Sequence, residues 1–180
     1  MPGLKLNPDF AEAASCFTSF QLKIVREARE RAANLVSNYY CVAPREWKQM
    51  PYEVKTLRAL DTCEVTDAAL AHTVCYGFKR EAGSVVLEEG DLYRICLQDH
   101  LILCAARDTQ IRLKPLLTYV LTHELVHVVR FGQQLQRVDL PYELRSDEEN
   151  RVERTTRNIL AGSGDREVSR FLSNQLVHSL

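Results

Sequence analysis

Two histidines and one glutamate lie within five consecutive residues, at His123, Glu124 and His127. Residues four apart on an α-helix share a face, so both imidazoles can point at one position. Zinc accepts neutral imidazole nitrogens, and catalytic zinc sites combine three protein ligands with a water whose pKa falls to about 7. A carboxylate beside that water can take its proton and later deliver it to a leaving amine. The segment therefore predicts a hydrolytic metal site with Glu124 as the base.

A strongly apolar helix is predicted to carry these residues, from Pro115 to Phe131. Pro115 suits the first turn of a helix, and Gly132 suits the position just past its end. Apolar residues surround the few polar ones, so we expect this helix to be buried at the centre of the domain. A pair of hydrogen-bonded core histidines is the alternative interpretation. The metal site is favoured because polar side chains inside such a helix are costly to bury without partners.

The segment from His123 to His127 resembles the HExxH motif of the zincin metallopeptidases. The resemblance implies an α+β, zincin-like fold, with a small antiparallel sheet, a central buried metal-binding helix and surrounding helices. It also implies Zn²⁺ held by the two histidines, Glu124 as general base, and hydrolysis of a peptide or protein substrate. The matching residues, Leu116–Phe131 and Asp147–Leu160, make up about a sixth of the chain.

Two other functions remain open for such a chain. A zincin-fold protein could use its zinc for regulation or partner binding without significant proteolysis. The intact Glu124 argues against a purely structural zinc, because structural sites are normally closed by a fourth protein ligand. The third possibility is a metal-free scaffold in which the histidines belong to the core.

A third ligand is needed, and its type separates the branches of the zincin family. Metzincins carry another histidine shortly after the motif, but the segment from Val128 to Gln133 contains none. In gluzincins a glutamate on a downstream helix completes the site, and an Asp, Glu or Asn four residues later supports the first histidine. In its compact size the chain is similar to the minimal intracellular zincins, which include antirepressor and stress-response proteases. We therefore expect a gluzincin-like site of this minimal type.

The downstream helix is expected over Asp147–Ala161, and it offers Glu149 and Glu153 at the spacing of four. The resemblance implies Glu149 as the third zinc ligand. It implies Glu153 as the acceptor of the free ring N–H of His123, a role that fixes the tautomer of a ligand. Glu153 and Glu148 remain alternatives for the third ligand. The acidic cluster also suits a helix N-terminus, where negative charge is favoured.

Groups that would contact substrate are also expected. Charge developing on a substrate oxygen needs a donor, and the candidates by type are Tyr142, Arg145 and His178. Tyr142 is preferred because it lies in the predicted loop between the two metal-bearing helices, although an exposed structural tyrosine is an equal alternative. The strand expected over Leu92–Gln98 occupies the place where zincins carry an edge strand that binds extended peptides. An ordinary interior strand is the alternative there.

Hydrophobic spacing predicts the remaining elements. Further helices are predicted over Thr18–Tyr40, Tyr52–Ala59, Thr66–Tyr76 and Arg166–Val177. Short strands are predicted over Val85–Leu87, Leu92–Gln98 and Leu101–Ala105, with turns at Glu88–Asp91 and Asp99–His100. This order predicts one domain over residues 1–180, made of a helical part (1–80), the sheet with the active-site helices (83–161) and a final helix (166–177).

Composition narrows the classes of partner. Lys and Arg number 23 against 24 Asp and Glu, so the net charge of -1 gives no reason to expect nucleic acid. No apolar run approaches the roughly 18 residues that a membrane span needs, and the first residues lack the apolar stretch of a signal peptide. A cytoplasmic protein is therefore predicted, with no membrane partner.

The six cysteines form no CxxC pair, and without an export signal we expect reduced, mostly buried thiols. His72 and Cys75 are three residues apart within a predicted helix. A second metal site on one helical face would use this pair, but no matching second pair accompanies it.

Overall fold

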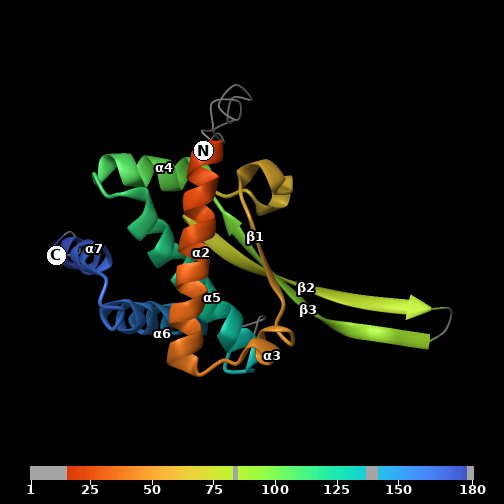
Figure 1. Cartoon of the computed structure of the whole chain (residues 1–180). Coiled ribbons are helices and arrows are strands. Elements are labelled where there is room, and N and C mark those ends of the chain that lie inside the picture. Colours follow the sequence, from red (N-terminus) through yellow and green to blue (C-terminus); the bar gives the residue numbers. More distant parts are fainter. Residues whose placement is uncertain (1–15, 83–84, 137–141, 178–180) are drawn as a thin grey trace.

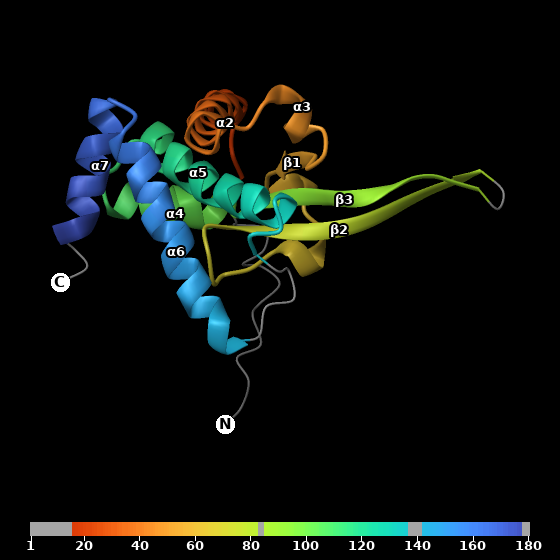
Figure 2. The same ribbon diagram turned by 90° about the horizontal axis from the view of Figure 1, so that it is seen from below.

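The computed structural model describes residues 16–82, 85–136 and 142–177, and within them the fold is α+β (Figure 1). The helices gather at one end of a small sheet, from which two strands extend outward as a ribbon (Figures 1 and 2). The helices and strands in chain order are α2 (Ser19–Tyr40), α3 (Pro44–Trp47), β1 (Tyr52–Lys55), β2 (Ala71–Ala82), β3 (Val85–Leu97), α4 (Asp99–Asp108), α5 (Leu113–Gly132), α6 (Tyr142–Ala161) and α7 (Arg166–Val177). Within the described ranges, no helix combines the length and apolarity that crossing a membrane requires.

β3 is the central strand of the sheet, whose order is β1-β3-β2. It pairs antiparallel with β2 and parallel with the short β1, so the sheet is mixed rather than antiparallel as expected. The predicted strands Val85–Leu87 and Leu92–Gln98 fall within this single long strand, apart from the final Gln98. The turn predicted at Glu88–Asp91 is wrong, because those residues pair with β2 without interruption.

Two of the predicted helices are wrong. Tyr52–Ala59 begins as β1 and ends in a 3-10 turn, and Thr66–Tyr76 contains the first half of β2. Partners on β3 decide both cases: the guanidinium of Arg94 pairs with Glu53 at 2.6 Å and lies over the ring of Tyr76. These partners are distant in sequence, so the apolar spacing within each segment does not reveal them.

One predicted strand is also wrong. Leu101–Ala105 lies within α4, and the turn expected at Asp99–His100 is the start of that helix. The carboxylate of Asp99 accepts the backbone N–H groups of Phe17 and Leu57, which ties the start of α4 to two distant segments. A short apolar run is compatible with a strand or with a buried helix, and here the tertiary contacts decide.

The longer predicted helices are confirmed. α7 has the predicted bounds, and α2 begins directly after its N-cap Thr18, whose hydroxyl accepts the N–H of Gln21 in a capping box. α5 extends a little beyond its predicted segment at both ends, and α6 begins earlier, at Tyr142. Regular apolar spacing over several turns explains why these elements could be found from the sequence.

Gly132 ends α5 instead of following it, and its role is close packing. A Cβ built on this residue would lie 2.7 Å from the Cβ of Met50, which is buried in the connection between α3 and β1. The missing side chain therefore lets the end of α5 approach that connection.

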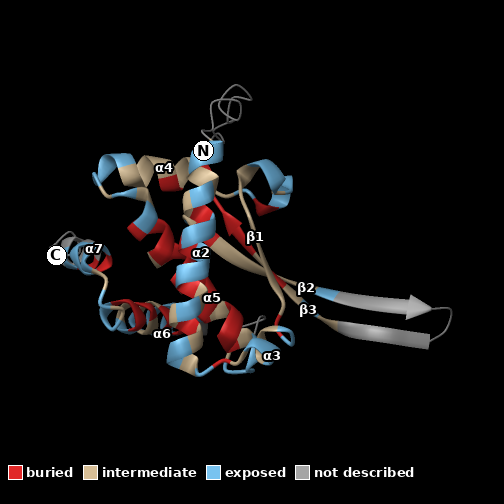
Figure 3. Cartoon of the chain, in the orientation of Figure 1, coloured by how far each residue is buried: buried red, intermediate tan, exposed pale blue. Residues whose placement is uncertain are grey.

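α5 is the central helix, as predicted (Figure 3). It packs along α2 on one side and against α6, α7, α4 and β2 on others. Its core residues include Leu117, Leu121, Leu125 and Val128, none of which is exposed. A helix covered on so many faces holds its polar residues rigidly, and the candidate site lies on it.

The cysteines depart from the prediction. None of the six is in a disulfide, but only Cys96 is buried, while Cys41 and Cys63 are exposed. The suggested second metal pair is also wrong, because His72 and Cys75 lie on β2. Residues three apart on a strand point to opposite faces of the sheet.

Candidate metal centre

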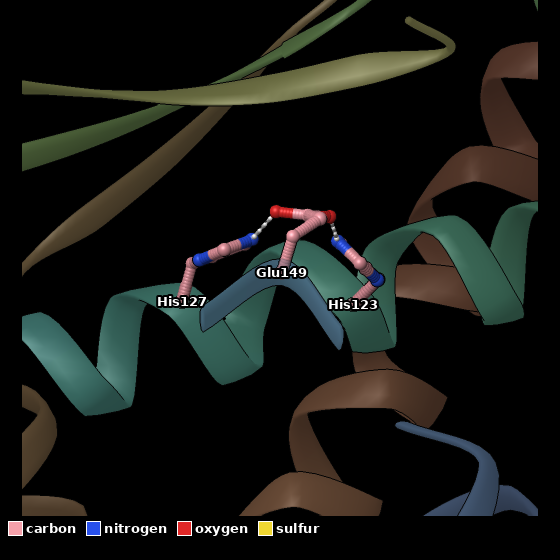
Figure 4. A group of neighbouring side chains, drawn as sticks. All are labelled: His123, His127 and Glu149. Atoms are coloured by element: carbon pink, nitrogen blue, oxygen red, sulfur yellow. Dashed lines mark ion pairs between the residues drawn. The ribbon is translucent and has the colours of Figure 1, made fainter. Parts of the chain in front are cut away.

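His123 and His127 lie one turn apart on α5, and both turn their Nε2 atoms toward Glu149 of α6 (Figure 4). Nε2 of His123 lies 2.8 Å from one carboxylate oxygen of Glu149, and Nε2 of His127 lies 3.4 Å from the other. The ligand atoms of the three side chains lie within 4.8 Å of one another. Two imidazole nitrogens and one carboxylate form a donor set that zinc accepts in catalytic sites. The residues present therefore fit the metal that the motif implies.

The opposite ring nitrogens of the two histidines each face an oxygen acceptor. Nδ1 of His123 lies 3.5 Å from the carboxylate of Glu153, and Nδ1 of His127 lies 3.3 Å from the side-chain oxygen of Gln136. An acceptor at Nδ1 favours the tautomer that leaves Nε2 free to bind a metal. The contact at Nδ1 thus orients each ring, through a carboxylate for His123 and through an amide oxygen for His127.

Glu153 is itself held in place by two neighbours. The hydroxyl of Tyr119 on α5 donates to one of its oxygens, and Nε of Arg157 donates to the other at 2.6 Å. The hydrogen bond from His123, with those from Tyr119 and Arg157, lowers the pKa of Glu153 to about 2 against the effect of burial. Its carboxylate is therefore ionised and occupied on both oxygens.

The electrostatics of the centre favour positive charge. Burial lowers the pKa of His123, but its hydrogen bonds to Glu149 and Glu153 outweigh burial and raise the pKa to about 10. Hydrogen bonds from His123 and His127 hold the pKa of Glu149 well below its usual range. The carboxylates that favour the charged form of His123 would also favour a dication at this position.

Glu148 has a different environment from the other two acids of α6. It is buried, and its carboxylate oxygen lies 2.6 Å from Nε of Arg130 on α5. Arg151 approaches its other oxygen at 3.5 Å. Glu148 therefore joins two helices, and of the three acids weighed for the third ligand position only Glu149 faces both Nε2 atoms.

Glu124 lies beside the histidines and is only 5% exposed. Its Oε2 accepts a hydrogen bond from the hydroxyl of Thr73 on β2, at 2.8 Å. Both residues line a cavity of about 540 Å³ that also contains His123, His127 and Glu149. A carboxylate in this place is within a substrate-sized space and next to the candidate ligands, as a general base must be.

The cavity is bounded on one side by the start of β2. Its lining residues from this side are Ala69, Leu70, Ala71, His72 and Thr73. The strand expected to bind substrate, Leu92–Gln98, is instead the central strand β3, which has neighbours on both sides. β3 became central because β1 pairs with it, and the edge strand beside the cavity is β2.

Of the three predicted donors for a substrate oxygen, only Arg145 has a described side chain. Tyr142 is the first residue of α6 rather than a loop residue, and its side chain is outside the described part. Arg145 is exposed on α6 and does not line the cavity. His178 lies outside the described residues. The role of Tyr142 stays a prediction.

Besides Tyr119 and Arg157, which hold Glu153, three more residues at or near the centre were missed from the sequence. Thr73 comes from a strand predicted as a helix, Gln136 from the segment after α5, and Arg130 was treated only as part of the central helix. Arg130 gave a usable signal, because a charged residue on an all-round apolar helix requires a buried partner. The other two gave none, since threonine and glutamine are common in strands and loops.

The chain was compared with protein-family models, with curated proteins and with solved structures, and none of the three comparisons gives a match.

Proposed function

We propose that this chain is a zinc-dependent metallohydrolase of the gluzincin-like zincin type, and that it hydrolyses peptide bonds. One observation carries the proposal: Nε2 of His123, Nε2 of His127 and the carboxylate of Glu149 converge on one position, with Glu124 beside it in a cavity. The three converging residues would hold Zn²⁺. When bound, the metal would supply Lewis acidity to polarise a substrate carbonyl and to activate water.

Glu124 acts as the general base in this proposal. Its carboxylate takes a proton from the attacking water and delivers it to the leaving amine. Thr73 occupies one of its oxygens and leaves the other for this exchange. Burial of Glu124 shields the proton transfer from bulk solvent, because only a small part of the residue is exposed.

The lining of the cavity favours an uncharged scissile group. Glu124, Glu149 and Glu153 contribute carboxylates, and its described lining includes no Lys or Arg. Phosphate esters are normally held by such cations, so a peptide carbonyl is the better supported target. β2 adds to this choice, because within the described residues it is an edge strand beside the cavity, and such an edge can align an extended peptide by backbone hydrogen bonds.

Metal content and cleavage test the proposal together. Purified chain should contain close to one zinc per molecule, and it should cleave members of a mixed peptide library. The Glu124→Gln variant should keep its zinc and lose cleavage, because the amide fills the same space as the carboxylate but cannot act as a base. Asp147→Asn, at an exposed position of α6, is the matched control and should behave as wild type.

The outcomes separate the possible functions. Absence of zinc after expression with ample metal would contradict the metal site. Equal cleavage by wild type and Glu124→Gln would reject Glu124 as the base. Zinc without any cleavage would favour a regulatory or partner-binding zinc instead of a peptidase.

A further inference from the structure

Thr73 is the point where the edge strand touches the proposed base. Its hydroxyl donates to Oε2 of Glu124 at 2.8 Å, and no second hydrogen bond to Glu124 is found among the described side chains. Glu124 lies on α5 and Thr73 on β2, so this bond joins the metal-bearing helix to the sheet. Among the described side chains, Thr73 is therefore the one that orients this carboxylate by a hydrogen bond.

The backbone N–H and C=O of Thr73 point away from β3, toward the outer edge of the described sheet. The N–H of Gln98 donates to the C=O of Leu70, which identifies these two residues as a hydrogen-bonded pair of the antiparallel ladder. Such pairs alternate along two antiparallel strands, and the register of β2 and β3 is regular from Ala71 to Arg80. Ala71 and Thr73 are thus in the alternate positions, whose N–H and C=O groups turn away from β3.

We propose that Thr73 is a positioning residue that orients both the proposed base, Glu124, and the substrate. Its backbone N–H and C=O pair with an extended peptide, while its hydroxyl holds Glu124 toward the atoms to be attacked. The inference rests on the proposed function and adds a residue to it. It explains why the base lies against the edge strand, and it favours unfolded peptide segments as substrates, since only these can pair with a strand edge.

Two substitutions distinguish the role of the Thr73 hydroxyl from the role of its backbone. Thr73→Val keeps the shape and the preference for a strand but removes the hydroxyl. Thr73→Ser keeps the hydroxyl. Because neither change alters the backbone edge, both should leave substrate pairing and therefore KM close to the wild-type value. Loss of the hydrogen bond should lower kcat about tenfold in Thr73→Val, and Thr73→Ser should stay within about twofold of wild type.

A second measurement does not require turnover. Acetohydroxamic acid binds zinc as its anion, and the proton that it loses is accepted by a neighbouring carboxylate, so its affinity reports the position of Glu124. Zinc-loaded wild type, Thr73→Val and Thr73→Ser are compared by calorimetry. Zinc content should be equal in all three. The affinity should fall about tenfold in Thr73→Val and be restored in Thr73→Ser.

The results distinguish this inference from the proposed function. Equal hydroxamate affinity in Thr73→Val and wild type overturns the inference. So does a loss of zinc or a rise in KM that Thr73→Ser fails to rescue, because either result indicates a structural role alone. A wild type that binds zinc and hydroxamate but cleaves no peptide overturns the proposed function, and the hydroxamate comparison still decides the role of Thr73.

Discussion

The guanidinium of Arg130 and the carboxylate of Glu148 form a buried ion pair between α5 and α6, with Nε of Arg130 2.6 Å from Oε1 of Glu148. Glu148 directly precedes Glu149, whose carboxylate faces both histidines. The ion pair therefore ties α6 to α5 at the residue next to Glu149.

Removing one partner of this pair should affect stability and zinc binding together. Glu148→Ala leaves the buried Arg130 without its carboxylate, which should lower the free energy of unfolding by about 3 kcal/mol. It should also weaken zinc binding, because Glu149 is less well held. Urea unfolding of the metal-free protein and competition with a zinc chelator measure the two effects. Arg151→Ala removes an exposed partner of the same carboxylate and should change stability by less than about 1 kcal/mol.

Glu149→Ala should remove a metal ligand. Loss of a group that supports a ligand weakens metal binding by about 10- to 100-fold. Loss of a ligand itself should cost more, so we expect zinc affinity to fall by more than about 100-fold. Chelator competition measures the change, and circular dichroism checks that the fold is kept. Asp147→Ala, which changes another exposed acid on the same helix, should retain wild-type affinity. Zinc binding that survives Glu149→Ala unchanged contradicts the proposed ligand set.

The acceptors behind the histidines should have smaller effects. Glu153→Ala and Gln136→Ala each remove an acceptor from an Nδ1 atom, and such losses weaken zinc binding by about 10- to 100-fold. The charged acceptor should matter more, because a carboxylate raises the basicity of the imidazole further than an amide does. The same chelator competition ranks the variants. A larger loss of zinc affinity in Gln136→Ala than in Glu153→Ala would contradict this prediction.

A buried carboxylate away from the centre predicts a pH dependence of stability. Burial raises the pKa of Glu64, but hydrogen bonds from Tyr76, from the N–H of Asp61 and from Arg94 outweigh it and lower the pKa from 4.5 to about 2. The folded state thus holds this proton less tightly than the unfolded chain does. The stabilisation is complete above pH 4.5 and is lost as the pH falls from there through about 2.

Glu64→Gln provides the test of that window. The variant should be less stable than wild type by about 3 kcal/mol near neutral pH, because Arg94 loses its buried partner. The difference should shrink as the pH falls toward about 2. Urea unfolding of the metal-free proteins, followed through the single Trp47, measures it. A difference that stays constant down to the acid end of the window would contradict the sign derived above.

The sequence predicted those parts of the molecule that depend on local spacing. The positions of His123, Glu124 and His127 on a central helix follow from their spacing and from its apolar residues. The spacing of Glu149 and Glu153 on α6 places one at the Nε2 atoms and the other at Nδ1 of His123.

The predictions that failed concern elements and residues whose partners are far along the chain. β1 and β2 become strands through pairing with β3, and α4 becomes a helix through the segments that bind its first residue. Thr73 could not be found because its partner Glu124 is 51 residues away. Nothing within a short window distinguishes such a threonine from any other strand residue.

The acceptors at the two Nδ1 atoms have a consequence for conformational entropy. Glu153 and Gln136 restrict both imidazole rings when the chain folds, so the rings lose little further rotamer freedom when a metal arrives. In small zinc domains, by contrast, binding and folding are a single event. Here the core around α5 is built largely from apolar residues that need no metal to pack, so a metal would enter a site whose shape already exists. Chelation should therefore leave the helical circular dichroism signal in place, and returning zinc should restore the centre without refolding the chain.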